Sequence, residues 1–363
     1  MDPVISQCVI KARKAMNTNN KKAVELIYTA GNTYQMYFNS FACKFRCAMC
    51  NFGYGARFSV DEFKKDFDGI MAHFPDNVRV LVLESTGSFA DTNEITEELR
   101  RYVFEKLSYE KRLEAVIVET HYTTVTEGLL KELESYFGNT HIEVEFEFGL
   151  ESINPKVLQF YNKDIDLKKM KKTICEVNEY GFAGSVNILL GCPEFTISEQ
   201  IQDTRASIEW VMNECPKGTS CVVFPINVKK GSVIGHLYER GKYELIYLWE
   251  LIQLLYSLPV EWLEYVLIAW WGNRANCFDG ETAIVHPYAC KDCEMVLQSF
   301  CEKFYSAQSV FEKRQALEEV YSTKTCECRS AYERKRMSQE KQPPRSLDKR
   351  FEEYRANIAE IEL

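Results

Sequence analysis

Short apolar runs alternate with longer amphipathic stretches along most of this chain, and this alternation limits the fold more than any other feature. Six runs rich in β-branched and aromatic residues predict buried strands, at residues 33–43, 78–84, 113–120, 142–152, 185–193 and 219–228. The stretches between them, such as residues 124–137, carry apolar residues at helical spacing. Strands that alternate with helices form a parallel sheet covered by helices. The sequence therefore predicts an α/β fold of about six βα units.

Three cysteines lie close together directly after the first predicted strand: Cys43, Cys47 and Cys50. In parallel α/β folds functional groups gather at the carboxyl ends of the strands, so this loop belongs to the functional end. Thiolates are soft ligands that suit iron–sulfur clusters or zinc. A closed zinc site takes four protein ligands, whereas three thiolates leave one iron of a four-iron cluster open to a small molecule. A zinc site with a distant fourth ligand is the alternative interpretation.

The C-x3-C-x2-C spacing, on the loop after the first strand of a βα series, resembles the motif of the radical S-adenosylmethionine (SAM) superfamily. This resemblance implies a partial (βα)6 TIM-like barrel, in which each of the three cysteines binds one iron of a [4Fe-4S] cluster. It implies that the fourth iron binds SAM, and that an electron from a partner such as flavodoxin or ferredoxin cleaves SAM to a 5′-deoxyadenosyl radical. That radical would take a hydrogen atom from the substrate.

The same resemblance implies SAM contacts from the cysteine loop and from the ends of the later strands. The superfamily usually has an aromatic residue before the third cysteine; here it is Met49, with Phe52 and Tyr54 as nearby aromatic alternatives. Small residues after the second strand would receive the SAM amino group. The candidates at the strand ends, in chain order, are Ser85, Thr86, Gly87, Ser88, Glu119, Glu151, Asn187, Pro225 and Asn227. Each has a plainer alternative, such as an ordinary turn, a helix cap or backbone support.

Longer stretches narrow the resemblance to one branch of the superfamily. STGSFAD, VETHYTTVTEGLL and FEFGLESINPKVL are similar to the branch that contains the archaeosine synthase radical SAM subunit and the catalytic subunit of Elongator. The resemblance covers residues 33–335 and implies the radical SAM fold and cofactor, but it leaves the substrate open. The net charge of −9 fits poorly with a transfer RNA (tRNA) substrate, because a nucleic-acid partner usually requires a basic surface. We therefore expect a small-molecule or modified-nucleoside substrate, with a tRNA-modifying enzyme of archaeosine synthase type as the alternative.

Four more cysteines form two pairs near the end of the chain: Cys290 with Cys293, and Cys326 with Cys328. Four thiolates from two short loops suit a tetrahedral zinc ion. The C-x-C pair is rarer in zinc sites than the C-x2-C pair, and four cysteines would also satisfy an auxiliary iron–sulfur cluster. Unliganded cysteines are the third interpretation. We expect zinc, which would pin this segment to the barrel.

Charge and hydropathy predict the remaining organisation. Four parts are expected: an N-terminal extension at 1–32, the radical SAM barrel at 33–275, the cysteine-rich segment at 276–335 and a charged, solvated tail at 336–363, for which a terminal helix stays open. Residues 270–280 mix aromatic and polar side chains and would cover the open side of the barrel or pack in its core. There is no uncharged apolar run of about eighteen residues, so no membrane span is expected. Fourteen cysteines, partly in close groups, fit a reducing, cytoplasmic location.

Two classes of function remain open from the sequence. The cysteine motif and the βα order predict a radical SAM enzyme with a [4Fe-4S] cluster, SAM and zinc as cofactors. The alternative from another class is a non-catalytic iron–sulfur or zinc protein that binds a partner. Cleavage of SAM by the reduced protein would separate the two.

Overall fold

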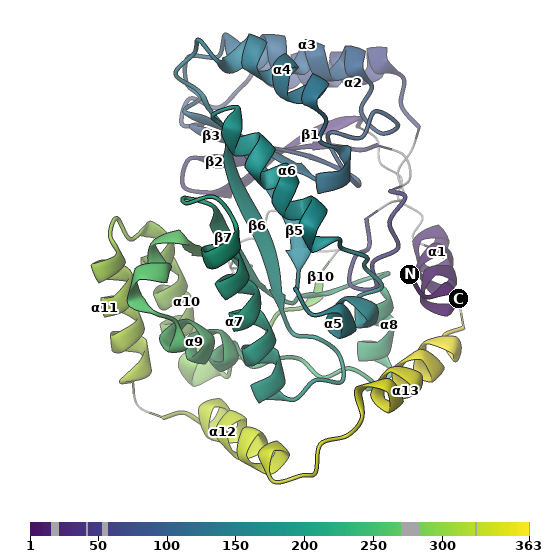
Figure 1. Ribbon diagram of the computed structural model, residues 1–363, viewed down its shortest axis with the longest axis vertical. Coiled ribbons are helices and arrows are strands. Elements are labelled where there is room, and N and C mark those ends of the chain that lie inside the picture. Colours follow the sequence, from purple (N-terminus) through teal and green to yellow (C-terminus); the bar gives the residue numbers. More distant parts are fainter. Residues whose placement is uncertain (16–21, 41–42, 53–56, 270–282, 324, 363) are drawn as a thin grey trace.

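The computed structural model describes residues 1–15, 22–40, 43–52, 57–269, 283–323 and 325–362. Tyr54 and the segment 270–280, both singled out above, lie outside these residues. The centre of the described chain is an eight-stranded sheet with the order β1-β2-β3-β4-β5-β6-β7-β9 (Figure 1). This sheet decides where the ends of the strands, and hence the candidate site residues, come together.

The parallel part of the sheet carries the predicted βα rhythm. Within the described residues, seven strands run parallel in sequence order: β2 (Thr33–Phe38), β3 (Val80–Ser85), β4 (Ala115–Thr120), β5 (Glu143–Glu151), β6 (Ala183–Leu190), β7 (Ser220–Pro225) and β9 (Val266–Ile268). The first six are the predicted strands, and the curled sheet confirms the predicted α/β fold and partial barrel. Helical crossovers bring the carboxyl ends of all these strands to one edge.

One edge strand of the eight-stranded sheet was not predicted. β1 (Val24–Ala30) pairs antiparallel with β2 at the edge of the sheet. Gly31, with φ of 56°, and Asn32 form the turn between them, where glycine adopts the left-handed conformation at low cost. The predicted N-terminal extension thus contains a strand of the sheet, and before it helix α1 (Pro3–Ala15).

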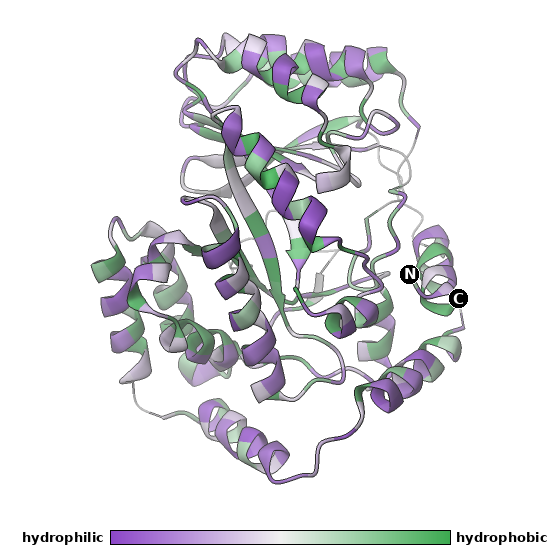
Figure 2. Cartoon of the chain, in the orientation of Figure 1, coloured by the Kyte–Doolittle hydropathy of each residue, from purple (hydrophilic) through white to green (hydrophobic). Residues whose placement is uncertain are grey.

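Helices cover the outer face of the sheet. They are α2 (Val60–Met71), α3 (Glu97–Ser108), α4 (Glu127–Phe137), α6 (Leu167–Glu179), α7 (Ile197–Glu214) and α9 (Leu248–Ser257). Figure 2 shows hydrophobic and hydrophilic residues on different sides of such helices. Strand side chains such as Leu83, Val118 and Phe146 belong to the apolar core that these helices share. Because side chains alternate along a strand, their neighbours in sequence point into the barrel.

Shorter elements follow the strands at their carboxyl ends. η1 (Tyr122–Thr124) follows β4, and α5 (Pro155–Phe160) follows β5. After β7 come β8 (Val228–Lys229) and α8 (Val233–Glu239), and β8 pairs antiparallel with β10 (Ala283–Val285). η2 (Val260–Tyr265) instead precedes β9, at the amino end of that strand. The elements that follow β4, β5 and β7 lie around the loop that carries the three cysteines.

The last part of the chain is helical and returns to the barrel. α10 (Lys291–Ser306) and α11 (Val310–Tyr321) pack against each other, and α12 (Glu327–Glu340) lies against α7. α13 (Leu347–Ala359) then packs against α1, α5 and α8. None of the helices among the described residues is long and apolar enough to cross a membrane.

Helix α13 corrects the prediction of a solvated tail. Phe351, Tyr354 and Ile358 are buried in a second apolar core that also contains Phe160. Arg350 of the same helix is buried and forms an ion pair with Glu199 of α7 at 2.8 Å. The apolar residues lie three and four positions apart, so they form one helical face although charged residues dominate the composition.

Candidate functional site

The cysteine loop leaves β2 at the carboxyl edge of the sheet and is held by backbone hydrogen bonds. The N–H of Ala48 donates to the carbonyl of Tyr161 at 2.9 Å, and the carbonyl of Ala48 accepts from the N–H of Ile234 at 3.2 Å. The loop is thereby fixed to the segments after β5 and β7. Cys43 is buried, and Cys47 and Cys50 are half-buried. The N–H of Phe52 donates to Cys50 Sγ at 3.3 Å.

The three thiols of the loop influence one another. Burial and the neighbouring Cys50 thiol raise the pKa of Cys43 to about 12, and burial raises the pKa of Cys47 to about 11. Bound metal reverses such a shift, because its positive charge favours the thiolate. Among the described residues, these sulfurs do not form a group compact enough for one metal ion. Three thiols on one loop are a donor set that suits an iron–sulfur cluster.

The small-residue turn after β3 lies directly against the cysteine loop. A Cβ at Gly87 would lie 2.8 Å from the Cβ of Cys43 and would collide with the carboxylate of Glu94. Glycine is needed here because only a missing side chain permits this approach. Of the other predicted residues in the turn, Ser85 Oγ donates to Glu94 at 3.3 Å and Tyr37 donates to Thr86 Oγ1 at 3.4 Å. The predicted turn and the predicted cysteines therefore share one corner of the barrel.

Glu94 was missed by the sequence analysis. Its Oε2 accepts hydrogen bonds from Ser40 Oγ at 2.9 Å and from the N–H of Ser88 at 3.2 Å. Its Oε1 is buried and has no hydrogen-bond partner among the described residues. Burial raises the pKa of Glu94 above its usual value. A buried oxygen without a partner is costly, so this position suits a donor that arrives with a ligand.

The fourth residue of the turn, Ser88, joins a network of hydroxyl groups beyond β4. Its Oγ is 2.6 Å from Thr120 Oγ1 and 2.9 Å from Thr124 Oγ1, and it accepts from the N–H of His121. The His121 ring stacks on Phe45 of the cysteine loop with a centroid distance of 4.1 Å. Burial and the nearby Lys163 lower the pKa of His121 to about 3, so the ring is neutral. This network fixes the β4 end against the cysteine loop.

A row of glutamates lines the inside of the barrel. Glu119 on β4 is in register with Glu147 on β5. Glu84 on β3 and Glu119 on β4 each come one residue after the paired residues Leu83 and Val118, so they lie side by side. Burial, followed by the charges of Glu84 and Glu147, raises the pKa of Glu119 well above its usual value, and Lys229 opposes this rise. Glu119 does not act as the predicted helix cap, because His121 caps η1 and Thr126 caps α4.

Glu151 ends β5 in a left-handed conformation, with φ of 67°. Its Oε1 accepts from Lys163 Nζ at 2.6 Å, and only about a tenth of each side chain is exposed, 11% and 10%. Asn154, not Glu151, caps helix α5. Lys163 also lies close enough to Cys47 to lower its pKa. The structure thus places Glu151 next to the cysteine loop, but as half of an ion pair.

The later candidates are spread over the ends of β6 and β7. Asn187 is 8% exposed, and its Oδ1 has no hydrogen-bond partner among the described residues. It alternates with the outward-facing Val186 and Ile188, so it points into the barrel. Pro225 ends β7, and the Asn227 amide lies 3.3 Å from His286 Nδ1.

The two described candidates for the SAM adenine lie in different surroundings. Phe52 packs against Tyr37 of β2, with ring centroids 5.7 Å apart, and Lys229 Nζ lies 4.4 Å from the Phe52 ring centre. Met49 instead packs against the second apolar core. Phe52 is therefore the one that faces the glutamate-lined side of the loop.

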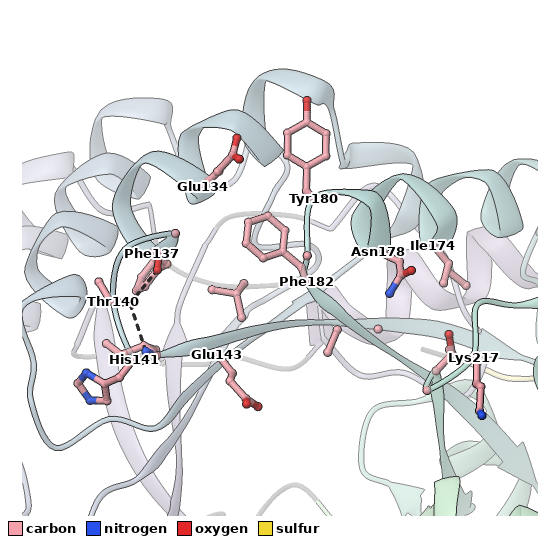
Figure 3. A pocket seen from close by; sticks show the side chains of 18 residues that line it. Glu134, Phe137, Thr140, His141, Glu143, Ile174, Asn178, Tyr180, Phe182 and Lys217 are labelled. Atoms are coloured by element: carbon pink, nitrogen blue, oxygen red, sulfur yellow. Dashed lines mark hydrogen bonds between the residues drawn. The ribbon is translucent and has the colours of Figure 1, made fainter.

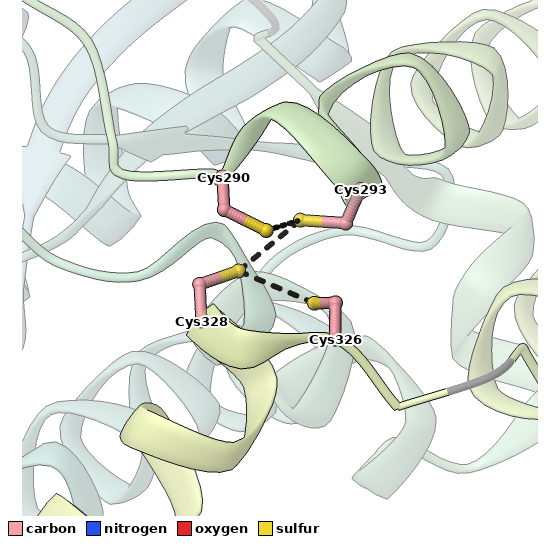
Figure 4. Close-up of side chains that lie close together, drawn as sticks. All are labelled: Cys290, Cys293, Cys326 and Cys328. Atoms are coloured by element: carbon pink, nitrogen blue, oxygen red, sulfur yellow. Dashed lines mark hydrogen bonds between the residues drawn. The ribbon is translucent and has the colours of Figure 1, made fainter.

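The four C-terminal cysteines come together in one compact group (Figure 4). Cys290 lies 3.6 Å from Cys293, Cys293 lies 3.1 Å from Cys328, and Cys326 lies 3.5 Å from Cys328, measured between sulfurs. A tetrahedral zinc ion with bonds of about 2.3 Å would hold its sulfurs about 3.8 Å apart. The size of this group therefore suits a single ion. Among the described residues it is the one group of three or more potential ligands gathered this closely.

Two helix starts hold this cysteine group. Cys290 is the N-cap of α10 and Cys326 the N-cap of α12. Helix N-termini stabilise thiolates through their free N–H groups and dipole. Although burial opposes it, hydrogen bonds around the Cys290 sulfur lower the pKa of this thiol to about 6. Burial raises the pKa of Cys293 and of Cys328, and a bound cation would reverse this by favouring their thiolates.

A separate cavity of about 630 Å³ opens at the other end of the barrel (Figure 3). Its lining includes Phe137, His141, Tyr180 and Lys217, which lie in segments that precede β5, β6 and β7. It therefore lies at the amino ends of these strands. The cysteine loop and the predicted site residues lie at the carboxyl ends.

Comparison with known proteins assigns part of the chain to a class of enzymes. Residues 40–205 match the sequence model of the Radical SAM superfamily. This segment contains the three cysteines of the loop and the strand ends from β3 to β6. The members of that superfamily are enzymes that use a [4Fe-4S] cluster and SAM.

Two of the relatives are named archaeosine synthase subunit beta. The protein from Methanosarcina acetivorans is 23% identical over 83% of this chain and 84% of its own length. The protein from Thermococcus kodakarensis is 28% identical over 47% of this chain and 52% of its own length. An uncharacterized protein of Methanocaldococcus jannaschii is 26% identical, and the match spans 62% of this chain but only 60% of that relative, less than two thirds.

Solved structures are similar to this chain at low sequence identity. Methylornithine synthase has 14% identity and a TM-score of 0.47, covering 73% of this chain and 70% of that protein. The archaeal Elp3 of Methanocaldococcus infernus has 15% identity and a TM-score of 0.43, covering 66% of this chain and 57% of that one.

Proposed function

We propose that Cys43, Cys47 and Cys50 hold a [4Fe-4S] cluster whose open iron binds SAM. The observation that carries this proposal is the corner where Gly87 lies against Cys43, at the carboxyl edge of a parallel barrel. When bound, the reduced cluster and SAM supply a 5′-deoxyadenosyl radical that takes a hydrogen atom from the substrate. The test is anoxic reconstitution with iron and sulfide, reduction, and assay for 5′-deoxyadenosine. An intact four-iron protein that forms none would favour the non-catalytic alternative.

The residues around the corner have distinct proposed roles toward SAM. The turn from Ser85 to Ser88 and the buried Oε1 of Glu94 would receive the SAM amino group. Phe52 would pack on the adenine, and the unpaired Oδ1 of Asn187 would accept a hydrogen bond from SAM. The remaining predicted residues would line the edges of the same site: Met49, Glu119, Glu151, Pro225 and Asn227.

Glu94→Gln is expected to weaken SAM binding roughly tenfold, since a charged hydrogen bond is worth about 1.5–3 kcal/mol. The amide keeps the shape of the side chain and loses the charge that an ammonium group requires. Titration of SAM onto the reconstituted protein measures the effect. Glu97→Gln is the matched control, because Glu97 is exposed in the first turn of α3. Equal SAM affinity in wild type and Glu94→Gln would mean that Glu94 only supports the turn.

For the substrate, we propose a small molecule or a modified nucleoside. The net charge of −9 supports this, because a long nucleic acid usually requires a basic surface. The relatives named archaeosine synthase subunit beta favour a second candidate, a tRNA-modifying enzyme. Binding of tRNA that weakens steeply with salt would support the second candidate, and absence of binding at low salt would remove it.

We propose zinc for the four C-terminal cysteines. The sulfur distances of 3.1–3.6 Å support one ion rather than an auxiliary iron–sulfur cluster. Zinc would hold the starts of α10 and α12 together and thereby tether the C-terminal helices. Metal analysis of protein purified without added zinc tests this. One zinc per chain is expected, and additional iron beyond the first cluster would favour the auxiliary cluster.

A further inference from the structure

Arg13 of helix α1 reaches beneath the cysteine loop. The helix packs against α8 and α13, and it lies outside the segment that matches the superfamily. Arg13 is 2% exposed, which makes it one of the most deeply buried large side chains among the described residues. A fully buried arginine is rare unless it meets negative charge.

The contacts of Arg13 lead to the cysteine loop. Its Nη1 donates to the carbonyl oxygen of Phe45 at 2.9 Å, between Cys43 and Cys47 in sequence. Its Nε is buried and has no hydrogen-bond partner among the described residues. No carboxylate among those residues forms an ion pair with it; by contrast, Lys44 pairs with Asp91 and Lys163 with Glu151.

The site that Arg13 contacts is the proposed cluster site. Arg13 Nη1 binds the loop at Phe45, two residues from both Cys43 and Cys47, so a cluster held by these thiolates would place negative charge close to the guanidinium. The guanidinium keeps its proton under all ordinary conditions, so its charge is permanent. In a buried setting such a charge acts strongly, because little water screens it.

We propose that Arg13 is a positioning residue of the cluster site, which holds the Phe45 carbonyl and provides a buried positive charge that favours the reduced cluster. The inference rests on the proposed function of Cys43, Cys47 and Cys50. Reduction adds one negative charge to a group that three thiolates already make anionic, and charge near a cluster is one determinant of its reduction potential. Helix α1 is on this view part of the redox site.

Arg13→Gln tests the charge, because glutamine keeps an N–H donor and loses the cation. The measurement is a reductive titration of the reconstituted protein without SAM, followed by electron paramagnetic resonance. We expect the ratio of reduced to oxidised cluster at the wild-type midpoint to fall at least tenfold, which is a shift of about 59 mV to more negative potential for one electron. Arg13→Lys keeps the positive charge, so its midpoint potential should stay close to that of the wild type. Lys14→Gln removes an exposed charge from the same helix and should leave the midpoint nearly unchanged.

The outcomes separate this inference from the proposed function. A wild-type midpoint in Arg13→Gln, or an equal shift in Lys14→Gln, would overturn the role of the buried charge. If Arg13→Gln assembles no cluster while Arg13→Lys assembles one, the need for the cation is supported; if neither assembles one, Arg13 is a packing residue and the inference is wrong. A wild-type protein without any four-iron cluster would overturn the proposed function and this inference together.

Discussion

Replacement of Cys43, Cys47 and Cys50 by alanine is expected to abolish both the iron–sulfur cluster and the cleavage of SAM. The effect should be complete, because these three thiols are the only protein ligands proposed for the cluster. The measurements are iron and sulfide content, the cluster absorption and the amount of 5′-deoxyadenosine, each after anoxic reconstitution. The wild type should form 5′-deoxyadenosine and the triple variant none above the protein-free reaction.

The control for this variant is Cys221→Ala. Cys221 is a single buried cysteine on β7 that faces the outer apolar core. Its loss should leave the cluster and SAM cleavage in place, at the cost of a small cavity. Cluster content that survives in the triple variant would contradict the assignment, since the iron would then be bound elsewhere. The C-terminal cysteine group would be the first place to look for it.

The sheet was predictable because its signal is local. β3, β4 and β6 are short runs with few polar residues, and each is bounded by helical periodicity. The hairpin of β1 and β2 also has a local signal, a Gly-Asn pair between two alternating runs, but the charged residues before it suggested an extension. The burial of helix α13 was missed for a similar reason. Its composition is strongly charged, and the few apolar residues that form its buried face do not stand out in that composition.

The candidate site was predictable only in part, because some of its residues come from distant segments. The cysteine loop and the turn at Gly87 follow strand ends, so parallel topology alone brings them to one edge. Glu94 lies beyond that turn, and Arg13 precedes the sheet altogether. Nothing in the local sequence distinguishes a buried arginine of an amphipathic helix from a solvated one. Only the fold shows that this side chain ends beside the cysteines.

Whether a charged residue forms an ion pair likewise depends on the tertiary structure. The sequence places both Glu119 and Glu151 at strand ends, where either can bind a cofactor. The structure gives Glu151 an ion pair with Lys163, whereas Glu119 stands beside two other glutamates. This difference makes Glu119 the more available of the two toward a ligand and Glu151 the more structural.

Loss of the C-terminal metal is expected to release the last helices and to destabilise the protein. Cys293→Ser removes one buried ligand, and the remaining three thiols would bind zinc far more weakly. The starts of α10 and α12 would then be held only by packing and by hydrogen bonds such as those from Arg329 to the carbonyls of Tyr321 and Thr323. We expect loss of zinc, a fall in unfolding free energy of at least about 3 kcal/mol, and faster proteolysis between α11 and α12.

A matched variant separates the metal from simple packing. Cys301→Ser lies on the same helix, α10, and is equally buried, but it lies outside the cysteine group. Each variant buries a new hydroxyl, so the packing and desolvation costs are comparable. Only Cys293→Ser should lose zinc. A chelator should therefore lower the stability of Cys301→Ser but leave that of Cys293→Ser unchanged. If neither variant changes the zinc content and both lose stability equally, the four sulfurs are neighbours that bind no metal, and the C-terminal helices are held by side-chain packing and polar contacts such as the Arg350–Glu199 ion pair.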